Sequence, residues 1–131
     1  MSDPITLFKE ASNMNRMVEN CFRKKKFDNK FLLSLATLSL EKYMVAYLLM
    51  KDEMPTGHTL THLIQRVAEY EKVSLSDVSL LEQLDEKIQL CSVSIAPEYV
   101  PENDEMEMII DVMEHIRKIV DQELSALLLK S

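Results

Sequence analysis

The sequence predicts an all-α domain, a five-helix up-and-down bundle, and three observations support this. The 131 residues include only one Gly and four Pro, too few to punctuate a many-stranded sheet. Hydrophobic residues make up 47% of the chain, enough to bury one continuous core. Apolar side chains recur at helical spacing, with no alternating strand pattern. We therefore expect residues 1–131 to form one domain.

The first helix begins at Asp3-Pro4, where the carboxylate accepts backbone N–H groups and Pro occupies the first helical position. One apolar stripe follows, made of Leu7, Phe8, Ala11, Met14, Val18 and Phe22. The basic cluster 23–26 complements the dipole at the end of this helix. The cluster is interpreted either as a solvated helix end or as an anion contact.

The second helix is predicted over residues 28–51, and it is apolar on more than one side. One face carries Leu32, Leu35, Ala36, Leu40, Tyr43, Ala46, Tyr47 and Met50, and Leu33, Leu38, Met44, Leu48 and Leu49 widen it. Such a helix is either central to a bundle or covered by a partner chain. We expect it to be central.

A turn at Met54-Pro55-Thr56-Gly57 precedes a third helix over residues 59–72, with Leu60, Leu63, Ile64 and Val67 facing inward. Residues 74–77 are loop or cap material, and Ser79-x-x-Glu82 is a capping-box pattern for a short fourth helix. Pro97 and Pro101 predict a loop over residues 92–103.

The fifth helix opens at Asp104-x-x-Glu107 and carries a bundle seam in steps of three and four residues. The seam consists of Met106, Ile109, Met113, Ile116, Val120, Leu124 and Leu127.

Composition narrows the function classes. The net charge of −7 disfavours strong nucleic-acid binding, because phosphate backbones are repelled.

Cys21 and Cys91 are expected to be reduced and buried, and the N-terminus does not resemble a secretory signal, so we expect a cytoplasmic protein. The longest apolar stretch, residues 43–50, is far shorter than the roughly 20 residues of a membrane span. No membrane association is expected.

The sequence contains few side chains suited to catalysis, metal binding or ligand binding. His58 and His62 are four residues apart, so on a helix both would face one zinc ion, but the glutamate of the zinc protease motif is missing. Packing or hydrogen bonding is the alternative for these imidazoles. Tyr43 and Tyr47 are one turn apart and are interpreted either as core residues with wet hydroxyls or as the lining of a base-stacking cleft. We expect no metal, no cofactor and no catalytic residue.

Acidic side chains gather between Glu102 and Glu114, but no Glu-x-x-His pair completes a di-metal bundle site, so a solvated acidic face is expected.

Three segments resemble the HEPN family, the higher-eukaryote and prokaryote nucleotide-binding domain. Glu41-Lys42-Tyr43 with Ala46, Leu48 and Leu49 is similar to the family's Glu-Lys helix pattern. His58-Thr59-Leu60 with Leu63 is similar to its His-Asp-Leu helix start, and Glu98-Tyr99-Val100-Pro101 is similar to its Tyr-containing loop. Two positions depart from the pattern. Val45 replaces a usual Lys, which removes a cation from the family's expected ligand groove, and Thr59 replaces the Asp.

Ribonuclease members of this family carry an Arg followed, four to six residues later, by a His. None of Arg16, Arg23, Arg66 and Arg117 has a His at that spacing, and His115 precedes Arg117. The resemblance therefore implies a non-catalytic module that binds a nucleotide or accompanies a minimal nucleotidyltransferase. The alternative is a ribonuclease toxin with a degenerate motif that uses His58 or His62.

The ligand-binding candidates at the turn after the second helix are Tyr43, Tyr47, His58 and His62, with any ligand held between the second, third and fifth helices. The apolar surface of the second helix and the Leu-rich end of the fifth exceed what one seam buries, which predicts a homodimer.

Overall fold

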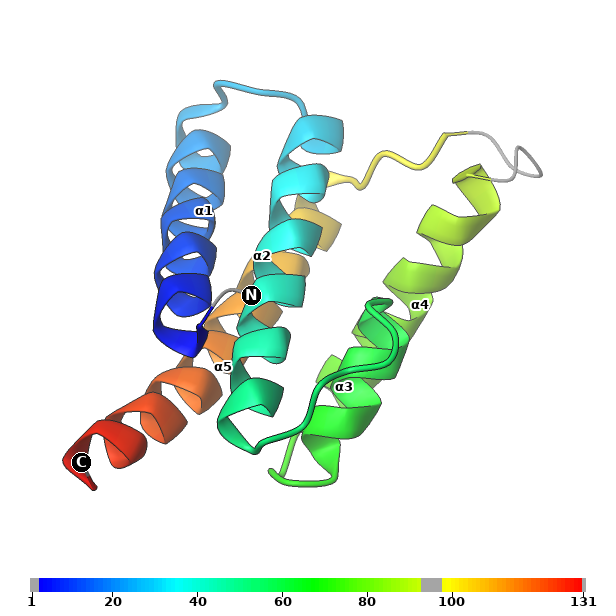
Figure 1. Ribbon diagram of the computed structural model, residues 1–131. Coiled ribbons are helices and arrows are strands. Elements are labelled where there is room, and N and C mark those ends of the chain that lie inside the picture. Colours follow the sequence, from blue (N-terminus) through cyan, green and yellow to red (C-terminus); the bar gives the residue numbers. More distant parts are fainter. Residues whose placement is uncertain (1–2, 93–97, 131) are drawn as a thin grey trace.

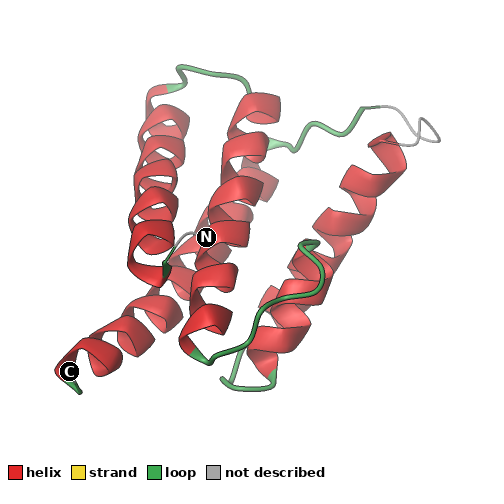
Figure 2. Cartoon of the chain, in the orientation of Figure 1, coloured by secondary structure: helices red, strands yellow, loops and turns green. Residues whose placement is uncertain are grey.

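The computed structural model describes residues 3–92 and 98–130, and within these residues it contains helices and loops but no strands (Figure 2). The five helices are α1 (Pro4–Lys24), α2 (Asn29–Met50), α3 (Leu60–Ala68), α4 (Leu75–Ser92) and α5 (Asn103–Leu129). The all-α prediction and the five-helix bundle are confirmed.

The long helices α1, α2, α4 and α5 alternate in direction, as an up-and-down bundle requires (Figure 1). The short helix α3 runs parallel to α2. The connection after α2 returns along it, so that His58 lies beside Glu41 in the middle of α2, while Arg66 near the end of α3 pairs with Glu53 just past the end of α2. The start of α3 therefore lies beside the middle of α2, where α2 faces α4.

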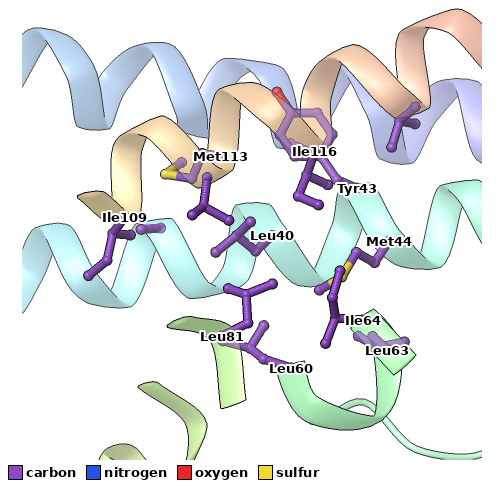
Figure 3. Close-up of a cluster of buried hydrophobic side chains, with 14 of the residues drawn as sticks. Leu40, Tyr43, Met44, Leu60, Leu63, Ile64, Leu81, Ile109, Met113 and Ile116 are labelled. Carbon is purple, nitrogen blue, oxygen red and sulfur yellow. The ribbon is translucent and has the colours of Figure 1, made fainter. Parts of the chain in front are cut away.

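Helix α2 lies at the centre of the bundle, as expected from its broad apolar surface. Its side chains Leu40, Tyr43 and Met44 are fully buried between α5 and the pair formed by α3 and α4 (Figure 3). Among the described helices it alone is long and apolar enough to cross a membrane by length and composition, yet 61% of that window is buried inside the protein. This burial is typical of a core helix.

Two side chains of α2 and α5 differ from the predicted faces. Leu38 is 40% exposed, because it points toward α4 across an open groove and not into the core. Leu127 of the predicted α5 seam is 44% exposed, since the last turns of α5 extend past the neighbouring helices (Figure 1).

Two helix boundaries differ from the prediction, and a side-chain hydrogen bond lies at each of them. The prediction that α3 reaches residue 72 is wrong, because α3 ends at Ala68 and Tyr70 turns aside to donate a hydrogen bond to Glu53. The prediction of a short α4 capped at Ser79 is also wrong. The Ser74 hydroxyl accepts the Asp77 N–H at 3.2 Å, so that α4 starts at Leu75.

The remaining ends follow the sequence more closely. Asp3 caps α1 and Asp28 caps α2 by accepting N–H groups three residues ahead. Helix α5 starts one residue before the predicted position, where Glu105 accepts the Glu102 N–H. Part of the predicted 92–103 loop, residues 93–97, lies outside the described residues.

Cys21 is a free thiol, as expected, but its side chain is half-buried and not fully buried as predicted. The side chain of Cys91 lies outside the described part of the chain.

Candidate functional site

A polar groove separates α2 from α4. It consists of two adjoining cavities of about 390 and 190 Å³, which share Ser34, Thr37 and Ile88 in their walls. The larger cavity extends to His58 and Thr59 at the start of α3, and the smaller one extends to Glu98 and Tyr99 before α5. We call this feature the α2–α4 groove.

The groove brings together residues from all three segments on which the family resemblance rests. Glu41 comes from the α2 segment, and its carboxylate contacts His58 Nδ1 of the second segment at 2.9 Å. At the other end, Glu98 of the third segment forms an ion pair with Lys30 of α2. Segments that are up to 57 positions apart in the sequence, from Glu41 to Glu98, therefore line one surface feature.

The lining of the groove is more acidic than basic. Glu41, Asp85 and Glu98 contribute carboxylates, whereas Lys30 contributes the lysine and His58 the imidazole. Asp85 is 9% exposed, and its Oδ2 accepts a hydrogen bond from Gln89 at 3.4 Å. Such a lining attracts cationic or hydrogen-bond-donating groups more strongly than phosphate.

Tyr99 closes the end of the groove near α5. Burial, followed by its hydrogen bond to Glu105 at 2.8 Å, raises the pKa of the Tyr99 phenol well above its ordinary value. The pKa of the Glu105 carboxyl is lowered, first by the hydrogen bond from the Glu102 N–H and then by the one from Tyr99. The phenol therefore stays neutral and acts as a donor at neutral pH.

Of the four predicted binding residues, the structure places only His58 in the groove. Tyr43 and Tyr47 are fully buried, so neither ring has an exposed face on which a base could stack. The Tyr43 hydroxyl accepts a hydrogen bond from Asn15 and donates one to Ser12. Both tyrosines are therefore core residues, but the Tyr43 hydroxyl contacts side chains where water was expected.

His62 lies apart from His58. His58 precedes the Thr59 N-cap, whereas His62 is inside α3 and its Nε2 lies 3.4 Å from the Thr56 hydroxyl. The two imidazoles therefore do not share one helical face. Within residues 3–92 and 98–130, no three His, Cys, Asp or Glu side chains are placed to hold a metal ion together.

The arginine and histidine of α5 point to different neighbours. His115 Nδ1 lies 2.9 Å from Asp77 Oδ2 on α4. Arg117 instead donates two hydrogen bonds to Glu114, at 3.0 and 2.6 Å, on the side facing α1. The bond from Arg117 also lowers the pKa of the Glu114 carboxyl. This guanidinium and this imidazole therefore do not converge on one substrate position.

Three buried polar residues, Asp77, Asp85 and Asn15, were not identified from the sequence. Asp77 and Asp85 are buried and each lies four positions from the buried Leu81, and Asn15 is buried between Ala11 and Val18. A polar residue within an apolar helical stripe is the signal that marks each of them.

Comparison with known proteins agrees with the fold and the three segments. A family model described as the HEPN domain matches residues 6–124. The solved structure of TT1696 from Thermus thermophilus is similar in fold, with a TM-score of 0.72 and 16% identity over 94% of this chain and 99% of that one. No curated protein sequence matches significantly. Because the family model covers most of the chain, this protein belongs to the HEPN domain family.

Proposed function

We propose that this protein is a non-catalytic HEPN module that acts as a binding or accessory subunit in the cytoplasm. The observation that carries the proposal is the divergence of Arg117 and His115 on α5. Each is held by a carboxylate, and the two face different helices. In a ribonuclease site of this kind a histidine would act as the general acid or base and an arginine as its electrostatic partner, so both would have to reach one substrate.

The α2–α4 groove is the binding surface in this proposal. It unites polar side chains of α2 with His58 and Tyr99, and its volume is in the range of small-ligand sites. The excess of carboxylates favours a protein partner that presents a basic segment over a ligand held through phosphate. A small nucleotidyltransferase is the candidate partner in this proposal, and a nucleotide, which the family resemblance implies, is the second candidate because this lining does not favour phosphate.

Activity and binding are tested separately. Purified protein is incubated with single-stranded and structured RNA, with and without divalent cations, and we expect no cleavage. Cleavage that His58→Ala or His62→Ala abolishes would establish the ribonuclease alternative and overturn the proposal.

Binding is followed by NMR on the ¹⁵N-labelled chain, with nucleotides and a Lys/Arg-rich peptide as the probes. We expect the backbone amides of residues 34–41 and 58–60 to shift with the peptide at lower concentration than with any nucleotide. Glu41→Gln removes a carboxylate from the groove and should weaken binding of the peptide. Glu69→Gln is the matched control, since Glu69 is exposed and lines neither cavity of the groove. Unchanged spectra with every probe would show that the groove is not a binding surface.

A further inference from the structure

The α2–α4 groove is elongated and follows one face of α2. Its lining residues on α2 recur in alternating steps of three and one, and they are Lys30, Leu33, Ser34, Thr37, Leu38 and Glu41. This spacing keeps them on a single helical face, which extends for about 16 Å, or about three turns. Asp85 and Ile88 form the opposite wall on α4, which inclines away from α2 toward its C-terminal end (Figure 1).

Apolar side chains run along the groove between its polar groups. Leu33 and Leu60 are buried in its walls, Ile88 is half-buried, and Leu38 is 40% exposed. The helices α1, α3 and α5 pack directly on α2, whereas the face that carries Leu38 borders the groove. A partner that covers this leucine removes apolar surface from water, which favours binding.

Most hydrogen-bond donors of the lining are already engaged within the protein. Ser34 Oγ donates to the Lys30 carbonyl at 3.3 Å, and Thr37 Oγ1 donates to the Ser34 carbonyl at 3.0 Å. The Tyr99 hydroxyl donates to a carboxylate of α5, and the Lys30 ammonium forms its ion pair with Glu98. The groove therefore presents acceptors more readily than donors.

The two walls of the larger cavity each contribute a carboxylate. Glu41 lies on α2 and contacts His58, and Asp85 lies on α4 and accepts from Gln89. A lysine or arginine side chain that enters this cavity from a partner therefore finds an anionic acceptor on either side.

This lining suits a helical segment better than an extended one. The backbone carbonyls of an extended segment need donors, which the groove supplies poorly, and walls made of helices offer no sheet edge for an added strand. A helix satisfies its own backbone groups and needs only side-chain contacts.

We infer that the α2–α4 groove binds an amphipathic helix of a partner protein. An apolar row of this helix packs against Leu38 and Ile88, and a lysine or arginine beside that row lies between Glu41 and Asp85. The inference rests on the proposed function of the groove as a binding surface, and it adds the conformation and the side-chain pattern of the partner segment.

The probes are two ¹³C-labelled synthetic peptides of about 14 residues with the same Leu, Lys and Ala composition. In the first peptide the leucines recur every three or four positions and form one helical stripe, with lysines beside it. In the second peptide the leucines alternate with the other residues, as in a strand. Each peptide is titrated into the ¹⁵N-labelled full chain and followed by NMR.

We expect the first peptide to shift the backbone amides of residues 30–41 and 85–88. It should bind at least about tenfold more tightly than the second peptide, because only a continuous stripe covers the apolar row of the groove. The ¹³Cα shifts of the first peptide should move to helical values in the complex.

Leu38→Asn removes the exposed apolar contact of the groove and should weaken binding of the first peptide by about three- to tenfold. Leu90→Asn is the matched control, since Leu90 is 37% exposed on α4, close to the 40% of Leu38, and lines neither cavity of the groove. This control should bind like the unmodified chain.

Equal affinity of the two peptides, extended ¹³Cα shifts in the complex, or full affinity in Leu38→Asn would overturn the helical partner while the groove remains a binding surface. Shifts of the same amides on raising the concentration of the chain alone would assign the groove to a second copy. A nucleotide that shifts them at lower concentration than either peptide would assign it to a small ligand. If no probe shifts these amides, the proposed function of the groove fails as well.

Discussion

Tyr43 and Tyr47 lie one turn apart on α2, and both are fully buried, yet removing their hydroxyl groups should change stability in opposite directions. The Tyr43 hydroxyl accepts from Asn15 at 3.0 Å and donates to Ser12 at 3.2 Å. The Tyr47 hydroxyl is buried and has no hydrogen-bond partner among the described residues. Burial is also the main cause of the raised pKa of each phenol.

In Tyr43→Phe, the amide nitrogen of Asn15 loses its partner in addition to the lost bond to Ser12. Leaving a buried polar group unsatisfied costs about 1–3 kcal/mol. In Tyr47→Phe, a hydroxyl that is desolvated without forming a bond is removed, and we expect a gain of up to about 1 kcal/mol. For a chain of this size, each kcal/mol corresponds to a change in Tm of about 3–5 °C.

Urea unfolding followed by circular dichroism measures both differences on the same scale. The dependence of the free energy of unfolding on urea should be equal in the three proteins, because no substitution changes the surface exposed on unfolding. Tyr43→Phe at least as stable as the unmodified chain would refute the reasoning. So would a loss of stability in Tyr47→Phe larger than that in Tyr43→Phe.

Three further predictions concern acid stability, self-association and capping. Hydrogen bonds, the largest from Arg66, lower the pKa of Glu53 to about 2, so this contribution to stability is complete above the ordinary pKa of 4.5 and is lost as the pH falls toward 2. Glu53→Gln should flatten that part of the curve of stability against pH, and an unchanged curve would contradict the assignment. Sedimentation at micromolar concentration should show a species larger than 15.2 kDa, which Leu127→Glu should dissociate; a single 15.2 kDa species in the unmodified chain would exclude the dimer. Ser74→Ala should cost about 1 kcal/mol of unfolding free energy and Ser79→Ala less, and the reverse order in urea unfolding would place the cap at Ser79.

The helices and the family were predictable from the sequence because both depend on short-range patterns. Apolar residues every three or four positions predict a buried helical face wherever it lies, and the broad apolar surface of residues 28–51 identified the central helix. Caps such as Asp3 and Asp28 involve residues only three positions apart. The three segments that resemble the HEPN family are likewise local, and the family match over residues 6–124 agrees with them.

The sites depend on contacts between segments that lie far apart in the chain, and periodicity does not specify such contacts. The return of the chain after α2 places His58 beside Glu41, although the spacing of the two histidines suggested a pair. The face of α2 that carries Tyr43 is visible in the sequence, but whether its hydroxyl meets water or Asn15 is decided by how α1 packs on α2. The sequence by itself therefore determined which residues are helical and which faces are apolar. Only the tertiary structure decided which polar groups meet, because each such contact joins atoms from different helices whose relative placement is set by the packing of the whole core.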